Sequence, residues 1–141
     1  MSNEELKAKL RQAGEEAWKG NLDALDKVYA ADYVYHRPPL PDLEGLEAAK
    51  QYIADARSAY SDIQWTYDEM IHEGNTTAYR WTWWAKHTGQ SPSLPIPPTG
   101  KEVTLKGCTV VHWADGKVIE EFEYADFLGF LQQLGVVPPL G

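Results

Sequence analysis

Two side chains in the C-terminal part of the chain have the chemistry needed to move a proton. Asp126 ends a segment of alternating side-chain character, and with a period of two it shares a face with Phe122 and Tyr124. If this face points inward, its apolar wall favours a carboxyl that acts as a base and removes a proton next to a carbonyl group. Asp126 also directly precedes an apolar run that begins at Phe127, so it is equally placed to cap a helix.

His112 is the second candidate, as a donor that would stabilise an enolate or protonate an alkoxide. It shares its strand face with Cys108 and Val110, whereas Val111 and Trp113 occupy the other face, so both faces are partly apolar. If His112 faces a pocket, the opposite face of the sheet needs a cover, and a homodimer is the simplest one. The alternative is a partly exposed or hydrogen-bonded strand histidine.

An aromatic stripe follows the central strand of this region. Tyr79, Trp81 and Trp83 share one face, which predicts a surface on which a flat, fused-ring ligand could stack. Such stripes are also typical of a protein core, so we assign only Trp81 and Trp83 to the wall of a pocket. His36 ends a predicted strand before two prolines, which fits a turn residue.

The other candidate groups give weaker evidence for a catalytic, metal or cofactor site. Glu120, Glu121 and Glu123 form an acidic cluster, but neighbours on a strand alternate between faces, so we expect most of them to be solvated or ion-paired. Cys108 is the single cysteine, the four histidines lack metal-ligand spacing, and the sequence has no Gly-rich phosphate loop. We therefore expect chemistry that needs no cofactor and no metal.

The totals limit the classes of protein that fit. The 141 residues suit one domain over positions 1–141, and a hydrophobic fraction of 43% supports a packed core. The net charge of −8 disfavours nucleic acids and anionic membranes as partners. The N-terminus lacks the pattern of a secretory signal, and no long apolar run occurs, so we expect a cytoplasmic protein.

The elements that must position these residues can be read from periodicity and turn signals. They are, in order, a helix from Ser2 to Gly20, a short helix capped by Asn21, a strand at 33–36, a helix with apolar positions from Leu46 to Tyr60, strands near 63–72, 76–88, 101–114 and 117–125, and a helix from 127 to 135. The run from Ser91 to Gly100 is predicted to be a surface connection. Strands of a dozen residues twist and bend, which predicts an α+β fold with a cone-shaped, curved antiparallel sheet, about three helices and one pocket.

This order of elements resembles the nuclear-transport-factor-2-like superfamily, and local sequence words resemble its SnoaL-like polyketide cyclases. The words are Asn21-Leu-Asp-Ala-Leu-Asp with Tyr33-Val-Tyr-His36, Pro97-Pro-Thr-Gly-Lys101, Asp115-Gly-Lys-Val-Ile-Glu-Glu121 and Asp126-Phe-Leu-Gly-Phe-Leu-Gln-Gln-Leu-Gly135. The resemblance implies an enzyme of the lyase or isomerase kind that closes a ring on a polyketide ester by intramolecular aldol condensation, without metal or nucleotide. It also implies that Asp126 is the base, that His112 is the pocket histidine and that His36 lies near the cavity.

Several functions remain open on this fold, because one fold hosts many chemistries. The leading prediction is a cofactor-free enzyme acting on a small hydrophobic carbonyl compound, with His36, Trp81, Trp83, Phe122 and Tyr124 contacting the substrate. Alternatives are a ketosteroid-type isomerase, an epoxide hydrolase and a non-catalytic module that binds a small molecule. The hydrolase needs two carboxylates and an arginine; Arg80 is available, but Thr82 lies where a carboxylate would be needed.

Overall fold

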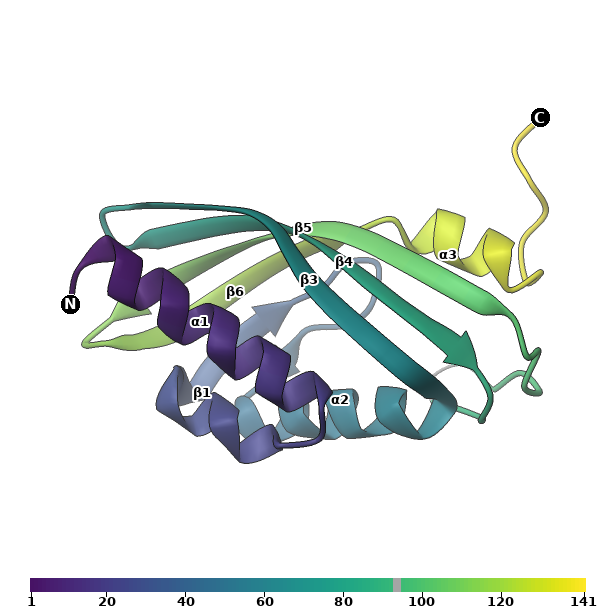
Figure 1. Ribbon diagram of the computed structural model, residues 1–141, viewed down its shortest axis with the longest axis horizontal. Helices are drawn as coiled ribbons and strands as arrows, with labels where there is room; N and C mark the ends of the chain where they lie inside the picture. Colours follow the sequence, from purple (N-terminus) through teal and green to yellow (C-terminus); the bar gives the residue numbers. More distant parts are fainter. Residues whose placement is uncertain (93–94) are drawn as a thin grey trace.

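A computed structural model describes residues 1–92 and 95–141. The described residues form three α-helices, one short 3₁₀-helix and six strands (Figure 1). In chain order these are α1 (Asn3–Trp18), η1 (Leu22–Lys27), β1 (Tyr29–His36), β2 (Leu43–Glu44), α2 (Leu46–Ala59), β3 (Tyr60–Glu73), β4 (Thr76–His87), β5 (Glu102–Ala114), β6 (Lys117–Ala125) and α3 (Phe127–Gln133).

The strands form one curved sheet in the order β2-β1-β6-β5-β4-β3. The meander from β3 to β6 is antiparallel, as the turn signals predict. The sheet as a whole is mixed, because β1 runs parallel to β6. The expected curved antiparallel sheet is confirmed except at this edge, where the long connection through α2 and the meander brings β6 back beside β1.

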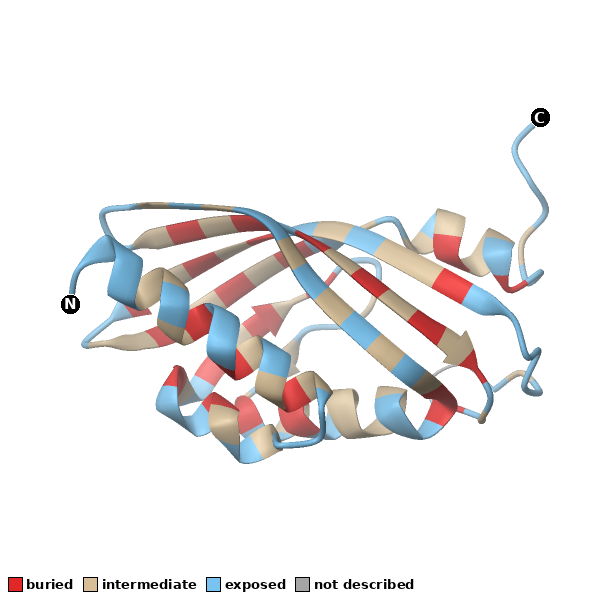
Figure 2. Ribbon diagram, in the orientation of Figure 1, coloured by how far each residue is buried: buried red, intermediate tan, exposed pale blue. Residues whose placement is uncertain are grey.

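Helices α1 and α2 lie on the same side of the sheet, and α3 packs beyond its far end against β5 (Figure 1). The buried positions follow this arrangement (Figure 2). On α1 the buried residues Leu10, Ala13 and Ala17 form one stripe, and along β4 buried residues alternate with partly exposed ones. The core and the enclosed space therefore lie between the helices and the concave face of the sheet.

Local signals set several element ends. The backbone N–H of Glu5 donates to Ser2 Oγ at 3.1 Å, which confirms the predicted cap of α1. Asn21 precedes η1 but makes no side-chain cap bond, so that part of the prediction is wrong. Tyr60 starts β3 and does not belong to α2. The predicted connection from Ser91 to Gly100 lies partly outside the described residues.

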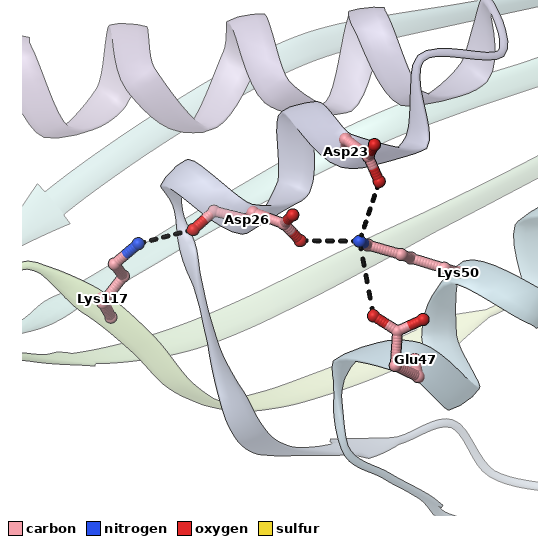
Figure 3. A network of polar contacts seen from close by, with 5 residues as sticks. All are labelled: Asp23, Asp26, Glu47, Lys50 and Lys117. Atoms are coloured by element: carbon pink, nitrogen blue, oxygen red, sulfur yellow. Dashed lines mark hydrogen bonds and ion pairs between the residues drawn. The ribbon is translucent and has the colours of Figure 1, made fainter.

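A buried lysine ties η1 to α2 (Figure 3). The Lys50 side chain is 9% exposed, and its Nζ lies 2.7 Å from Asp26, 3.1 Å from Asp23 and 3.5 Å from Glu47. Asp26 raises the pKa of Lys50 most strongly, so the ammonium stays charged. Lys117 Nζ of β6 donates to the Asp26 carbonyl at 2.5 Å and links the same turn to the sheet.

We expect Lys50→Met to lower the free energy of unfolding by about 1–2 kcal/mol, because methionine keeps the buried stem but leaves three carboxylates facing one another. Urea unfolding measures the change. Lys7→Met is the matched control, since Lys7 pairs at 2.9 Å with the well-exposed Glu4 and its loss should cost less than about 0.5 kcal/mol. Equal effects of the two variants would contradict a special role of Lys50.

None of the helices among residues 1–92 and 95–141 is long and apolar enough to cross a membrane.

Candidate active site

A cavity of about 280 Å³ opens between the concave face of the sheet and the helices. Half of its described lining residues are aromatic. The aromatic lining residues are Trp18, Tyr29, Tyr33, Tyr35, Tyr52, Tyr60, Trp65, Tyr67, Tyr79, Trp81, Trp83, Phe127 and Phe130. Gly14 of α1 makes room for this lining, because a Cβ at this position would lie 1.9 Å from the Tyr67 hydroxyl.

Two carboxyl groups are buried in this wall. Glu121 and Glu123 lie two residues apart on β6, so both point inward, and they are only 6% and 8% exposed. Burial raises the pKa of Glu121 well above its ordinary value, and the neighbouring charge of Glu123 adds to the rise. Burial raises the pKa of Glu123 to about 7. The pair therefore holds at least one proton at neutral pH, as two adjacent carboxyls in an apolar site do.

Tyrosines of the neighbouring strand hold this pair in place. Because β1 runs parallel to β6 with Tyr35 opposite Glu121, inward residues of the two strands lie side by side. The Tyr35 hydroxyl donates to Glu123 Oε2, which counteracts part of the burial effect on the pKa of Glu123. The Tyr33 hydroxyl acts in the same direction on the pKa of Glu121. Each carboxyl thus has its own tyrosine donor.

Arg37 reaches toward the pair from the end of β1. It is 8% exposed, its Nε donates to the Pro41 carbonyl at 3.0 Å, and its guanidinium lies 4.5 Å from the centre of the Tyr52 ring. Its positive charge opposes the burial-driven rise in the pKa of Glu123. Glu123 is therefore the member of the pair that ionises more readily, and Glu121 is the one that keeps its proton.

Asp126 lies outside the cavity wall. It is exposed, and its Oδ1 accepts from the Gly129 backbone N–H at 2.9 Å, so it is the N-cap of α3. The sequence left two placements of Asp126 open, an inward-facing base and a helix cap, and the structure has the cap. Phe127, its neighbour, does line the cavity. The catalytic role implied for Asp126 stays a prediction.

The remaining candidates separate into two groups. Trp81 and Trp83 lie in the cavity wall, as expected, and their contact with a substrate stays a prediction. His36, His112, Phe122 and Tyr124 share the outer, convex face. The expectation that Phe122 and Tyr124 point inward is wrong. The inward positions of β6 belong to the two glutamates, and Tyr124 is 59% exposed.

On the outer face these residues form a cluster of their own. The Phe122 ring lies between two imidazoles, with ring centres 4.7 Å from His36 and 5.6 Å from His112. His36 Nε2 lies 2.8 Å from Glu120, and its Nδ1 lies 3.0 Å from Asp42. These contacts raise the pKa of His36, with Glu120 as the main cause. His112 is thus a partly exposed strand histidine on this face.

Two further expectations concern the same face. Arg80 is 58% exposed and pairs with Glu69 at 2.8 Å, away from the cavity, so the epoxide-hydrolase alternative lacks its arginine there. The homodimer expected to cover the outer face stays a prediction.

The sequence analysis missed Glu121 and Glu123 as functional residues. A signal was present: counting in twos back from Ala125 places both glutamates on one face. The apolar character of Phe122 and Tyr124 instead suggested that their face points inward. That choice is wrong here, because the wall of this cavity contains two acidic side chains. Tyr33 and Tyr35, also two apart, are the partners that make the inward carboxyls stable, but their pairing depends on the parallel contact of β1 with β6.

The curved mixed sheet and the covering helices form an α+β fold of the ketosteroid-isomerase-like, or nuclear-transport-factor-2-like, kind. The model of the SnoaL-like polyketide cyclase family matches residues 8–134, so the chain belongs to that family, and the resemblance found in the sequence is confirmed. No curated protein sequence gives a significant match.

Solved structures share this fold along almost the whole chain. TsrD from Streptomyces laurentii is 22% identical, with 97% of this chain and 100% of that chain covered and a TM-score of 0.85. AclR, a proposed hydroxylase from Streptomyces galilaeus, is 22% identical, with 99% and 87% covered and a TM-score of 0.84. A proposed polyketide cyclase from Acidithiobacillus ferrooxidans is 28% identical, with 96% and 98% covered and a TM-score of 0.78.

Proposed function

We propose that this protein is an acid/base enzyme that removes a proton from the carbon next to a carbonyl in a small, flat, hydrophobic substrate, as in ring closure by aldol condensation. The observation that carries the proposal is the pair of buried carboxyls, Glu121 and Glu123, in the wall of an aromatic cavity. Membership of the SnoaL-like family supports the same reaction class.

The two carboxyls suit different roles. Glu123, with a pKa of about 7, is ionised in a substantial fraction of molecules at neutral pH and can accept the proton. Glu121, whose pKa is raised further by burial and by its neighbour, keeps its proton and can donate a hydrogen bond to the enolate oxygen. Tyr35 holds the Glu123 carboxylate, and the aromatic wall excludes water from the developing enolate.

The cavity also sets the size and character of the substrate. Its volume of about 280 Å³ lies near the lower end of ligand pockets, which span ~300–1,000 Å³. Stacking on tryptophan and tyrosine rings favours a planar molecule of two or three fused rings. Whether such a molecule is a polyketide ester follows only from the family, and we include it in the proposal on that basis.

Proton abstraction can be tested without the natural substrate, through hydrogen–deuterium exchange. The C1 protons of 2-tetralone, a flat neutral ketone, are followed by proton NMR in deuterated buffer with and without protein. We expect the wild type to accelerate the exchange and the double variant Glu121→Gln/Glu123→Gln to give the buffer rate. A wild type that binds 2-tetralone but leaves its exchange rate unchanged would contradict the proposal and favour a module that only binds its ligand.

A further inference from the structure

The cavity combines aromatic rings and acidic side chains in one wall. None of its described lining residues is a lysine, an arginine or a histidine, whereas Glu121 and Glu123 are acidic and aromatic rings make up half of the lining. The faces of aromatic rings and carboxylate groups both attract organic cations. This combination therefore suits a ligand with a positively charged nitrogen far better than it suits an anion.

The carboxyl of Glu121 is open toward the cavity. Tyr33 is the one hydrogen-bond donor that the described residues place on it, so at least one of its two oxygens has no partner in the protein. Among the described residues, the unpaired buried polar atoms that lack accessible surface belong to Trp65 and Trp83 alone. The unpaired oxygen of Glu121 therefore keeps accessible surface. Because Glu121 is buried and lines the cavity, a bound ligand can reach this oxygen.

Glu121 also differs from Glu123 in its charge partners. The Tyr35 hydroxyl donates to Glu123, and the positive charge of Arg37 opposes the burial-driven rise in the pKa of this residue. No lysine, arginine or histidine among the described residues does the same for Glu121, whose pKa is raised by burial and by the charge of Glu123. A buried carboxyl without a cation keeps its proton. An ammonium group on a ligand would supply the missing cation and replace that proton.

Tyrosine rings surround Glu121 on three strands. Burial, with the charge of Glu121 as a further cause, raises the pKa of the five tyrosines Tyr29, Tyr33, Tyr35, Tyr67 and Tyr79. These hydroxyls stay neutral near pH 7, so the two glutamates are the members of this cluster that titrate there. The Tyr67 ring centre lies 5.2 Å from that of Tyr79 and 5.5 Å from that of Trp65, which continues the aromatic wall.

We propose that the cavity also binds small aromatic amines, with the protonated nitrogen of the ligand against Glu121 and its rings against the aromatic wall. This inference goes beyond the proposed function and does not depend on it. A carbonyl compound accepts a hydrogen bond from the protonated carboxyl, whereas an ammonium pairs with the carboxylate, and the carboxyl proton then leaves to the solvent. The cavity volume of about 280 Å³ limits the ligand to an amine on one or two fused rings.

Three probes on one ring system test the preference for positive charge by calorimetry at pH 7. 2-Aminotetralin is a cation, 2-tetralol is neutral, and tetralin-2-carboxylate is an anion. We expect the wild type to bind the amine at least about tenfold more tightly than the alcohol, and to show no binding of the carboxylate. Glu121→Gln should reduce the preference for the amine to within about twofold. The control Glu73→Gln removes an exposed negative charge on β3 and should keep the full preference.

A second readout uses the wild type alone, so it does not depend on the folding of a variant. Calorimetry in phosphate and in Tris, two buffers with different heats of protonation, counts the protons released on binding. We expect about one proton for the amine and about none for the alcohol. The inference is overturned by a wild type that binds the amine no more tightly than the alcohol, by amine binding without proton release, or by a full preference in Glu121→Gln.

These measurements need no turnover, so they are separate from the test of the proposed function. A preference for the amine without exchange of 2-tetralone protons would contradict the proposed function alone. Exchange without a preference for the amine would contradict this inference alone. Where both are found, 2-aminotetralin should inhibit the exchange, because the two ligands occupy the same cavity. An exchange rate unchanged at a saturating concentration of the amine would place the amine elsewhere and overturn the inference.

Discussion

The free energy of unfolding is expected to fall by about 2.5 kcal/mol between pH 5 and pH 8 through Glu123 alone. The folded protein raises the pKa of this carboxyl from 4.5 to about 7, and each unit of difference is worth ~1.4 kcal/mol. Glu123→Gln should remove this fall, because glutamine fits the same buried site without a proton to lose. Urea unfolding at both pH values measures the effect.

The sign follows from which state binds the proton. Below the ordinary pKa of a glutamate, both states hold it and the stabilisation is complete. As the pH rises toward about 7, the unfolded chain releases its proton while folded Glu123 keeps it, so stability is lost. Burial raises the pKa of Glu121 as well, so its contribution has the same sign.

Other groups titrate in the same window, and the comparison of two proteins separates them. The pKa of His36 is raised by Glu120, so its contribution is also lost as the pH rises. Burial lowers the pKa of His87, and this contribution has the opposite sign. Both are common to the wild type and Glu123→Gln, and so cancel in the difference. The exposed Glu73 gives the control, Glu73→Gln, which should keep the wild-type pH dependence. A Glu123→Gln variant with the full fall would show that Glu123 is ionised in the folded state.

The elements of this fold were accessible from the sequence because each carries a local signal. The capping box at Ser2 marks α1, and the Asp115-Gly116 turn marks the hairpin between β5 and β6. The change from a period of three and four to a period of two locates the start of the meander. Such signals involve residues that are close together in the sequence, so they can be read without knowledge of the tertiary structure.

The parallel contact between β1 and β6 has no such signal. It joins residues such as His36 and Phe122, which are more than eighty positions apart. The residue pattern of neither strand indicates which strand pairs with it. The short strand β2 was missed for the same reason, since two residues carry no periodicity. Long-range pairing is decided by which faces the whole sheet can bury, and one strand alone does not contain that information.

The candidate site could be predicted only in part. Trp81 and Trp83 were placed in the wall correctly, because an aromatic stripe on a central strand is usually buried in the core or in the wall of a cavity. Glu121 and Glu123 belong to an acidic cluster whose members were mostly expected to be solvated or ion-paired, and a buried carboxyl needs partners that hold it. The hydroxyls of Tyr33 and Tyr35 are those partners, and they reach the pair only across the contact that the sequence does not reveal.

The exchange of 2-tetralone protons should then depend on Glu123 far more than on Asp126. We expect Glu123→Gln to slow the protein-catalysed rate by about 10²–10⁴, the usual contribution of a positioned general base. Asp126→Asn should stay within about twofold of the wild type, because asparagine can still accept from the Gly129 N–H and cap α3. Proton NMR of the same ketone measures all three proteins.

The pH profile of this exchange distinguishes a base in the cavity from a base on the surface. With Glu123 as the base, the rate should rise with pH and level off above about 7, where the folded carboxyl is ionised. A base outside the cavity would not share this profile, because it lacks the burial that raises the pKa of Glu123. A flat profile together with a large loss in Asp126→Asn would transfer the role of the base to Asp126. It would also require α3 to move, because the cap holds that carboxylate outside the cavity wall.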